Sequence, residues 1–316
     1  MNVAVLIICF KRSDNVRKLL TSICEQGVTK VYLAIDGPSD SDTSIGDLIE
    51  SESREIARRF GLDFHIWKRE SNLGPAVSVI TAIDWFFSSE KAGVILEDDL
   101  VISSDLLQYF DFMLDRFESN QNVMMLSGTQ FVNSEESEEL RWTSYPVIWG
   151  WASWSDRWDM YRDRIAILNR SKIKGTTKER RYWKTGLRRC SSGIQDAWDI
   201  PLAVSQLASE KKTILPPVNL ISNQGADEFA GNTVIDAWPL SMEIFQLPNN
   251  YLDFEFDVKN LDSSLDEFMR SEVYNLKNLR ILPVFLSRLL DYFRFPNGSR
   301  KSILIDRLSQ ARLPNQ

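Results

Sequence analysis

The stretch VAVLIICFKRSDNVRKLLTSICEQGVTKVYLAIDG, residues 3–37, decides the fold. It opens with a continuous apolar run over 3–9, which is typical of a strand buried on both faces of a parallel sheet. A second strand of the same kind is predicted over 30–35. Between the two runs, apolar residues recur at the spacing of an amphipathic helix: Val16, Leu19, Leu20, Ile23 and Cys24.

The same alternation continues as far as residue 128. The pattern predicts further strands over 63–67, 93–97 and 123–128, and helices over 46–60, 75–88 and 104–118. Strands that alternate with helices favour right-handed crossovers between neighbouring parallel strands. The sequence therefore predicts an α/β fold with a mostly parallel sheet that is flanked by helices on both faces.

Composition narrows the class of protein. A chain of 316 residues with 43% apolar content can form one large α/β domain with an appendage. The net charge, 37 − 44 = −7, argues against a nucleic-acid partner, because phosphate neutralisation needs a basic face. The first residues resemble a buried strand rather than a signal peptide, and no stretch approaches the roughly 18–20 apolar residues of a spanning helix. Three widely spaced cysteines fit reduced thiols, so a cytoplasmic protein is expected.

The chain offers few routes to catalysis other than carboxylates. Its single histidine, His65, excludes multi-histidine metal sites and leaves one possible base for a serine triad. Neither the GxxxxGK[ST] nor the GxGxxG phosphate-binding pattern occurs. Carboxylates are therefore the expected catalytic and metal-binding groups.

The most informative carboxylates are Glu97, Asp98 and Asp99, which follow directly on a predicted buried strand. Open α/β sheets bind their ligands at this carboxyl edge. Three adjacent carboxylates repel one another, and Mn²⁺ or Mg²⁺ is held by one or two carboxylates together with substrate phosphate oxygens. A divalent cation that bridges the protein to a nucleotide diphosphate is the expected cofactor. The alternative is a solvated acidic loop at the start of the next helix.

Seven segments together resemble a known family. In chain order they read LIICFKRSDNVRKLL (6–20), AIDG (34–37), KRESNLGPAVSVITAIDWFF (68–87), VILEDDLVISSDLLQYF (94–110), WGWASWSDRW (149–158), QDAWDIPLA (195–203) and PPVNLISNQGADEFAGNT (216–233). They resemble the GT-A glycosyltransferases, specifically bacterial nucleotide-sugar transferases distantly similar to the Golgi α-mannoside β-1,2-N-acetylglucosaminyltransferase.

The resemblance implies a domain organisation. Residues 1–235 are expected to form a GT-A catalytic domain with a nucleotide-sugar-binding half, 1–130, and an acceptor-binding half, 131–235. Residues 236–316 have little match to the family and are expected to form a mainly helical appendage. This region is basic from residue 277 onward, so it could rest on an anionic membrane surface or simply pack on the catalytic domain.

The resemblance also implies roles for residues on the donor side. Asp99 matches the metal ligand of the acidic triplet, and Asp36 matches an aspartate that reads the nucleotide base. The alternative for Asp36 is an ordinary Asp-Gly turn. The alternative for Arg69 is a charge on the surface with no role in binding. Trp149 and Gly150 are expected to line the pocket. The other residues expected to contact the donor are Arg12, Arg69, Asn72, Gly74, Glu97 and Asp98.

On the acceptor side, an inverting transfer needs one base to take the proton of the incoming hydroxyl. Asp196 matches the family's aspartate before a tryptophan and is the preferred base, with Asp199 as a second carboxylate on the same helix face. Asp196 could alternatively act only as the N-cap of a helix from 196 to about 209.

The tryptophan-rich and basic segments are ambiguous. Trp151, Trp154 and Trp158 have the spacing of a helix face packed into a core, although tryptophan also stacks on sugars. The run 170–189 carries nine Lys and Arg against one Glu, and would be either a loop that closes over the diphosphate or a solvated surface. Asn232 and Thr233 stand where the family usually has Thr-His, so metal dependence or donor choice could differ.

Taken together, these features predict a metal-dependent inverting glycosyltransferase of bacterial type, cytoplasmic or peripheral at the inner membrane face. It would move a sugar from a nucleotide diphosphate, expected to be UDP-linked, to a glycan or lipid-linked glycan in surface polysaccharide biosynthesis. One alternative is a non-catalytic protein that binds nucleotide sugars or carbohydrate. Another is a sugar-1-phosphate nucleotidyltransferase, whose GxGxR loop is absent after the first strand, where the chain reads CFKRSDN.

Overall fold

The computed structural model describes residues 1–38, 44–131, 139–225, 242–248, 251, 263–274, 276, 303–311 and 313–314. Its strands are β1 (Ala4–Cys9), β2 (Lys30–Ile35), β3 (Asp63–Lys68), β4 (Ala92–Glu97), β5 (Leu100–Ile102), β6 (Val123–Ser127), β7 (Arg141–Thr143), β8 (Trp151–Trp154), β9 (Lys212–Leu215) and β10 (Ile221–Asn223). Its helices are α1 (Ser13–Glu25), α2 (Ser44–Phe60), α3 (Gly74–Phe87), α4 (Leu106–Phe117), α5 (Ser155–Arg164), η1 (Ile165–Arg170), α6 (Thr177–Ser191), α7 (Asp199–Ser209), α8 (Ser263–Phe268), η3 (Met269–Val273) and α10 (Ile303–Gln310).

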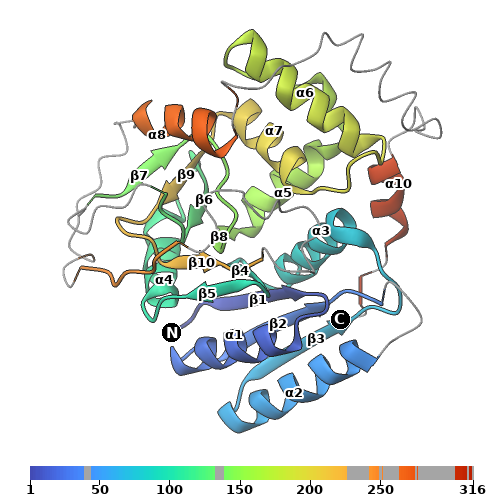
Figure 1. Ribbon diagram of the computed structural model, residues 1–316, viewed down its shortest axis with the longest axis vertical. Helices are drawn as coiled ribbons and strands as arrows, with labels where there is room; N and C mark the ends of the chain where they lie inside the picture. Colours follow the sequence, from blue (N-terminus) through green and yellow to red (C-terminus); the bar gives the residue numbers. More distant parts are fainter. Residues whose placement is uncertain are drawn as a thin grey trace.

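The predicted α/β class is confirmed. Eight strands form one sheet in the order β3-β2-β1-β4-β8-β6-β9-β7 (Figure 1). Strands β1 to β4 pair in parallel, as do β6 and β9, whereas β8 runs antiparallel to both β4 and β6, and β7 runs antiparallel to β9. A second, two-stranded antiparallel sheet joins β5 to β10.

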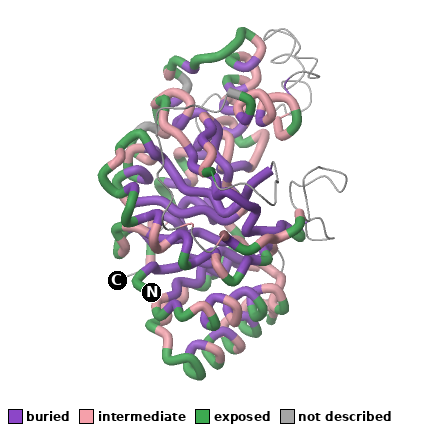
Figure 2. The backbone as a smooth tube through the Cα atoms, turned by 90° about the vertical axis from the view of Figure 1, so that its left-hand side faces the viewer, coloured by how far each residue is buried: buried purple, intermediate pink, exposed green. Residues whose placement is uncertain are grey.

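Side chains of the parallel strands alternate between two cores, one on each face of the sheet. In β1, Leu6 and Ile8 belong to the core under α3, and Val5 and Ile7 belong to the core under α1 and α4. This explains why the strands read as continuous apolar runs, because both faces are covered. Figure 2 shows the buried strands through the middle of the molecule and the exposed residues on the outer helices.

The elements up to β6 begin and end close to the predicted residues, and three later differences matter for the site. Helix α7 begins at Asp199, three residues after the predicted start, so Asp196 lies before the helix and is not its N-cap. Trp151 and Trp154 are in strand β8 and not in a helix. The basic run is not a loop throughout, since α6 occupies 177–191 and begins with a capping box between Thr176 and Glu179.

The described parts of the C-terminal region pack on the rest of the chain. Leu265, Met269, Leu304 and Leu308 are buried in the same core as α3. Helix α10 contacts both α3 and α6, as Figure 1 shows at the right-hand edge. No helix among the described residues is long and apolar enough to span a membrane. The three cysteines are buried free thiols, as expected.

Candidate functional site

The acidic triplet lies at the carboxyl edge of the parallel strands. Glu97 is the last residue of β4, and in the β1–β4 pairing it stands opposite Ile8. The backbone N–H of Asp98 donates to the carbonyl of Ile8 at 3.1 Å, so the turn after β4 is fixed against β1. Strand β5 then begins at Leu100 and leads the chain away from the edge. The sheet thus presents the triplet where the sequence predicts a ligand site.

Asp98 is a buried carboxylate tied to the loop after β1. It accepts hydrogen bonds from the backbone N–H of Phe10 at 3.1 Å and from Nη1 of Arg12 at 2.9 Å. Arg12 Nη1 also lies 4.0 Å from Oδ2 of Asp99. A charge-assisted bond of this kind orders the Arg12 side chain and leaves its cation beside the triplet. Arg12, predicted to contact the donor, is thus held beside the triplet by Asp98.

Asp99 faces the segment that follows β10. Its carbonyl accepts the N–H of Gln224 at 2.8 Å, and a Cβ atom on Gly225 would lie 2.2 Å from Asp99 Oδ2. A larger residue at position 225 would therefore have to displace the Asp99 carboxylate from this position. Gly225 also donates its N–H to Oδ1 of Asn223 at 2.7 Å. Sequence analysis assigned no role to Asn223 or Gly225, because their position beside Asp99 depends on the β5–β10 pairing.

The carboxylates repel one another strongly. Burial raises the pKa of Glu97 to about 8, assisted by the negative charges of Asp99, Asp98 and Asp199, while Arg12 acts in the opposite direction. Asp199, at the first turn of α7, thus lies close enough to Glu97 to act on its charge. Burial likewise raises the pKa of Asp199 itself. The site gathers more negative charge than Arg12 balances, which favours a bound cation.

The donor set fits a hard divalent cation held partly by its substrate. Among the described residues, no three His, Cys, Asp or Glu side chains converge as a complete metal cage. Mg²⁺ and Mn²⁺ sites of nucleotide enzymes commonly use one or two carboxylates and take the remaining ligands from phosphate and water. Asp99, whose side chain is 17% exposed, is the carboxylate of the triplet best placed to do so.

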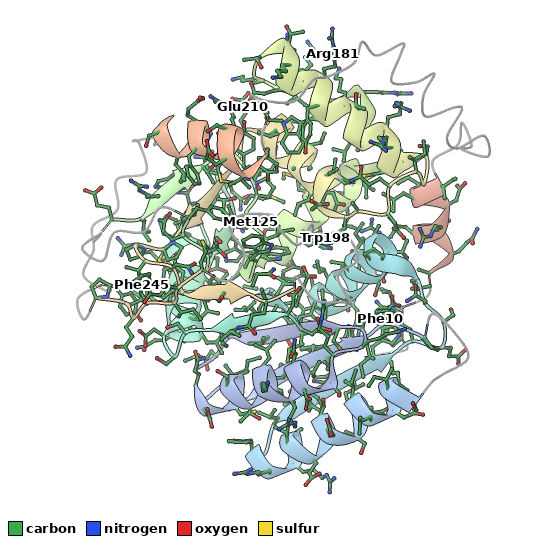
Figure 3. The ribbon with its side chains drawn as sticks, viewed as in Figure 1. Phe10, Met125, Arg181, Trp198, Glu210 and Phe245 are labelled. Carbon is green, nitrogen blue, oxygen red and sulfur yellow. The ribbon has the colours of Figure 1, made fainter. Side chains whose placement is uncertain are left out.

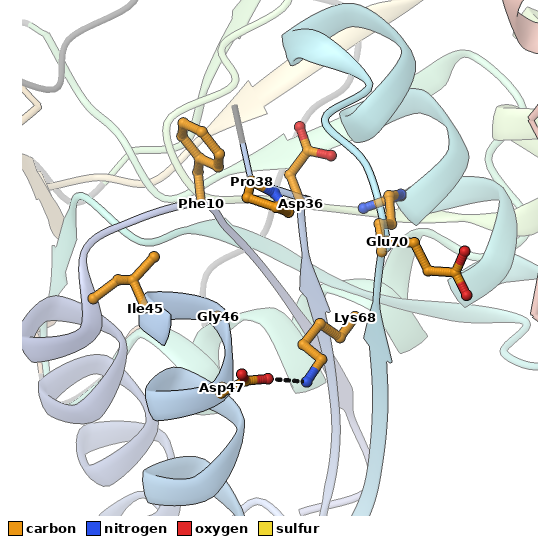
Figure 4. Close-up of a pocket in the computed structure, with 9 residues that line it drawn as sticks. Phe10, Asp36, Pro38, Ile45, Gly46, Asp47, Lys68 and Glu70 are labelled. Carbon is orange, nitrogen blue, oxygen red and sulfur yellow. Dashed lines mark hydrogen bonds and ion pairs between the residues drawn. The ribbon is translucent and has the colours of Figure 1, made fainter. Parts of the chain in front are cut away.

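A pocket lies at the ends of β1, β2 and β3, and one of its lining residues is Phe10, which donates its N–H to Asp98. It measures about 260 Å³. Figure 4 shows it between the loop after β1, the end of β2, the start of α2 and the end of β3. Phe10, Ile45 and Pro38 supply apolar surface, and Asp36 supplies a carboxylate. On its far side, Lys68 bonds Asp47 at 2.6 Å. The pocket therefore combines a small apolar surface with carboxylates and cations, the mixed lining that a polar ligand requires.

Asp36 links this pocket to the loop before α3. Its Oδ1 accepts the N–H groups of Gly37 at 2.9 Å and Leu73 at 3.2 Å, and its Oδ2 accepts from Nδ2 of Asn72 at 3.2 Å. Burial raises the pKa of Asp36 despite these hydrogen bonds. The residue therefore forms more than the Asp-Gly turn, because it also holds Asn72 and Leu73, which lie directly before α3.

Arg69 is buried and bound to α3. Its guanidinium donates to the carbonyl of Ser78 at 2.9 Å and to Thr81 Oγ1 at 3.0 Å, and it lies 4.0 Å from the ring centre of Trp67. Burial lowers its pKa to about 10. Arg69 is therefore not a surface charge. These contacts anchor the end of β3 to α3, while the residue still borders the pocket.

Asp196 and Asp199 have different surroundings. Asp196 Oδ1 accepts the N–H of Ala76 in the first turn of α3 at 3.2 Å, and its Oδ2 lies 3.3 Å from Nη1 of Arg307. Asp196 thus satisfies the N-terminus of a helix 120 residues earlier in the chain. Asp199, by contrast, makes no ion pair with a described residue.

Gly74 is fitted to this arrangement. Its φ is +70°, and a Cβ atom would lie 2.3 Å from Oδ2 of Asp196. We expect Gly74→Ala to lower the free energy of unfolding by about 3 kcal/mol, from left-handed strain and overpacking. Gly27→Ala is the matched control, because Gly27 has φ +80° and open space around it, and it should lose only about 1 kcal/mol. Urea denaturation measures both losses, and equal values would contradict a tight contact at Gly74.

Three of the tryptophans are core residues, as predicted, whereas Trp149 and Gly150 do not line the pocket described above. Trp151, Trp154 and Trp158 are buried, and Trp151 stacks on Trp198 with ring centres 6.2 Å apart. Trp149 is half-buried between the two cores. A Cβ on Gly150, whose φ is +61°, would lie 3.1 Å from Leu96, the residue before Glu97.

The basic run at 170–189 and the Asn232-Thr233 pair were also singled out in the sequence. Figure 3 places Arg181, on the basic helix α6, at the outer edge of the molecule and far from Phe10. The first turns of α6 are therefore remote from the end of β1. Asn232 and Thr233 lie outside the described residues.

Comparison with known proteins gives weak structural similarities. Neither a protein-family model nor a curated protein sequence matches the chain. A UDP-glucose pyrophosphorylase bound to UDP-glucose is similar over 68% of this chain and 90% of its own, at 10% identity and a TM-score of 0.38. The glycosyltransferase GlyE of Streptococcus pneumoniae TIGR4 is similar over 86% of this chain and 64% of its own, at 11% identity and a TM-score of 0.36. At these values the similarities carry no argument about activity.

Proposed function

We propose that the protein is a nucleotide-sugar glycosyltransferase that uses a divalent cation. One observation carries the proposal: Glu97, Asp98, Asp99 and Asp199 interact at a sheet edge that also bears a base-sized pocket with Asp36 in its wall. The pocket would take the nucleoside, and Asp99 with Arg12 would face the diphosphate. Among nucleotide ligands, a nucleoside diphosphate sugar is favoured because it brings phosphate oxygens to the cation and a sugar towards Asp199.

The proposed reaction is an inverting transfer. Asp199 takes the proton of the acceptor hydroxyl, whose oxygen forms a bond to the anomeric carbon on the face opposite the diphosphate. The bond between that carbon and the diphosphate oxygen breaks, and its electron pair leaves with the nucleoside diphosphate. Arg12 faces the charge that develops on the leaving group. A bound Mg²⁺ or Mn²⁺ would supply further charge neutralisation there.

Asp199 is preferred to Asp196 as the base for two reasons. First, a general base benefits from a raised pKa, and burial raises the pKa of Asp199. Second, the base must lie near the reacting centre, and the charge of Asp199 contributes to the raised pKa of Glu97 in the triplet. Asp196 is instead engaged by Ala76 and Arg307. The acceptor, a glycan or lipid-linked glycan of a surface polysaccharide, rests on the family resemblance alone.

Ligand binding tests the proposal without knowledge of the acceptor. We expect UDP with Mn²⁺ to raise the Tm of the wild-type protein, because a ligand that binds the native state stabilises it by mass action. UDP with a chelator should give a much smaller shift. Thermal-shift curves with UDP-, GDP-, ADP-, CDP- and dTDP-sugars identify the donor base. A protein whose Tm responds to none of them would overturn the proposed function.

Product analysis separates the alternatives. A sugar-1-phosphate nucleotidyltransferase would release pyrophosphate from a nucleoside triphosphate, whereas the proposed enzyme releases nucleoside diphosphate from the donor. A non-catalytic binding protein would show the Tm shift without slow hydrolysis of the donor. The loop after β1 favours transfer over nucleotidyl chemistry, since it contains Phe10 and Arg12 in place of a glycine-rich turn.

A further inference from the structure

The segment at residues 72–74, where the chain enters α3, is held from two sides by distant parts of the chain. On the pocket side, Asp36 accepts the N–H of Leu73 and the side-chain amide of Asn72, both at 3.2 Å. On the other side, Nη2 of Arg307 donates to the carbonyl of Leu73. The N–H of Leu73 is thus fixed by Asp36, which follows β2, and the carbonyl of Leu73 is fixed by Arg307 in the C-terminal helix α10.

Arg307 is well seated for this contact. Its neighbours in α10, Leu304 and Leu308, are buried in the core under α3. The start of the same helix is also packed, because a Cβ on Gly193 would lie 3.2 Å from Ile303. Figure 1 shows α10 between α3 and the end of α6. The helix therefore presents Arg307 from a fixed base.

The same guanidinium has a second acceptor, a carboxylate. Its Nη1 lies 3.3 Å from Oδ2 of Asp196, whose other oxygen accepts the N–H of Ala76. Arg307 and Asp196 therefore enclose the Leu73–Gly74 peptide and the first turn of α3 as one unit. A planar guanidinium can serve two acceptors in fixed directions, which a lysine ammonium on a flexible stem does less well.

We propose that Arg307 is a positioning residue for nucleotide binding. It acts through Leu73 on Asp36, and so couples the C-terminal helix to a pocket residue that lies 307 − 36 = 271 positions earlier in the sequence. Without Arg307 the loop at 72–74 loses its support on one side, and Asp36 loses the fixed donors that orient it. This inference rests on the proposed function, since the pocket is taken to bind a nucleoside.

Binding of UDP with Mn²⁺, measured by isothermal titration calorimetry at 20 °C, tests the role. We expect Arg307→Gln to raise the Kd about five- to tenfold, the effect of losing a hydrogen bond from a charged donor. Arg307→Lys should recover part of the affinity, because it can keep one of the two contacts. Gln310→Ala, at an exposed position of the same helix, is the matched control and should bind as the wild type does. Circular dichroism at the same temperature checks that every variant is folded.

A double-mutant cycle separates positioning from a general loss of stability. If Arg307 acts through the loop on Asp36, Arg307→Gln should change the Kd little in a variant that already carries Asn72→Ala and Asp36→Asn. Unchanged UDP affinity in Arg307→Gln, or a loss that adds in full to the effect of the loop variant, would overturn the positioning role. A wild-type protein that binds no nucleoside diphosphate would instead overturn the proposed function, and the positioning role with it.

Discussion

Asp99→Ala is expected to reduce the rate of sugar transfer strongly and to remove the Mn²⁺-dependent part of UDP binding. The carboxylate lies at the exit of β4, beside Arg12 and against Gly225, where a cation can reach both protein and diphosphate. Loss of electrostatic stabilisation of a leaving group costs about 4 kcal/mol, so the rate should fall by about 10³-fold. Release of UDP from the donor measures the rate, and calorimetry with and without Mn²⁺ measures the binding.

The control for this variant is Asp115→Ala, an exposed aspartate of α4 that should leave both quantities unchanged. Asp99→Asn keeps the volume beside Gly225 and removes the charge, so it separates a steric effect from an electrostatic one. If Asp99→Ala kept wild-type turnover in the presence of a chelator, the cation would have no part in the reaction.

Asp199→Asn is expected to reduce kcat by about 10²- to 10⁴-fold, the range contributed by general bases, and to change the affinity for UDP little. Since the base must be ionised, the wild-type rate should fall as the pH is lowered through the pKa of Asp199. Burial raises that pKa, so the acid limb should lie above the ordinary aspartate value, and it should disappear in the variant. Initial rates between pH 4 and pH 9 measure the limb.

Asp196→Asn distinguishes the two carboxylates. It weakens the contacts with Ala76 and Arg307, so it should affect UDP affinity and Tm more than kcat. The opposite order, with the larger loss of kcat in Asp196→Asn, would assign the base to Asp196.

Stability should also respond to Asp199 in a defined direction. Because its pKa is raised in the folded state, the native protein holds the proton more tightly than the unfolded chain does. Stability is therefore lost as the pH rises through this window. Asp199→Asn should have a higher Tm than the wild type at pH 7, and the difference should shrink as the pH is lowered.

Much of the sheet could be predicted because its signal is local. Residues 3–9 and 93–97 are buried on both faces, and the helices between them have clear apolar periodicity. Trp151 and Trp154 were harder, since a short apolar run with three-residue spacing fits a strand as well as a helix. Burial of these tryptophans could be predicted, but the element that contains them could not.

The candidate site was predicted where chain position determines it. A triplet directly after a buried strand must lie at the edge of the sheet, and Asp36 follows a neighbouring strand in the same way. The partners of Asp196 could not be predicted, because Ala76 and Arg307 are 120 and 111 residues away in sequence. Local pattern suggested a cap for the following helix, while the fold uses this carboxylate at an earlier one.

The reversed direction of β8 determines where the segment before it meets the sheet. Since it is antiparallel to β4 and β6, Trp151 pairs with Ile95 and with Ser127, and the chain enters β8 at the rim where its two neighbours leave the sheet. Trp149 and Gly150, directly before β8, thus stand in the middle of the sheet, four strands away from β3 at its edge. Because separate strands carry the two regions, substitutions in the turn before β8 can change its shape while the pocket at the ends of β1, β2 and β3 keeps its lining.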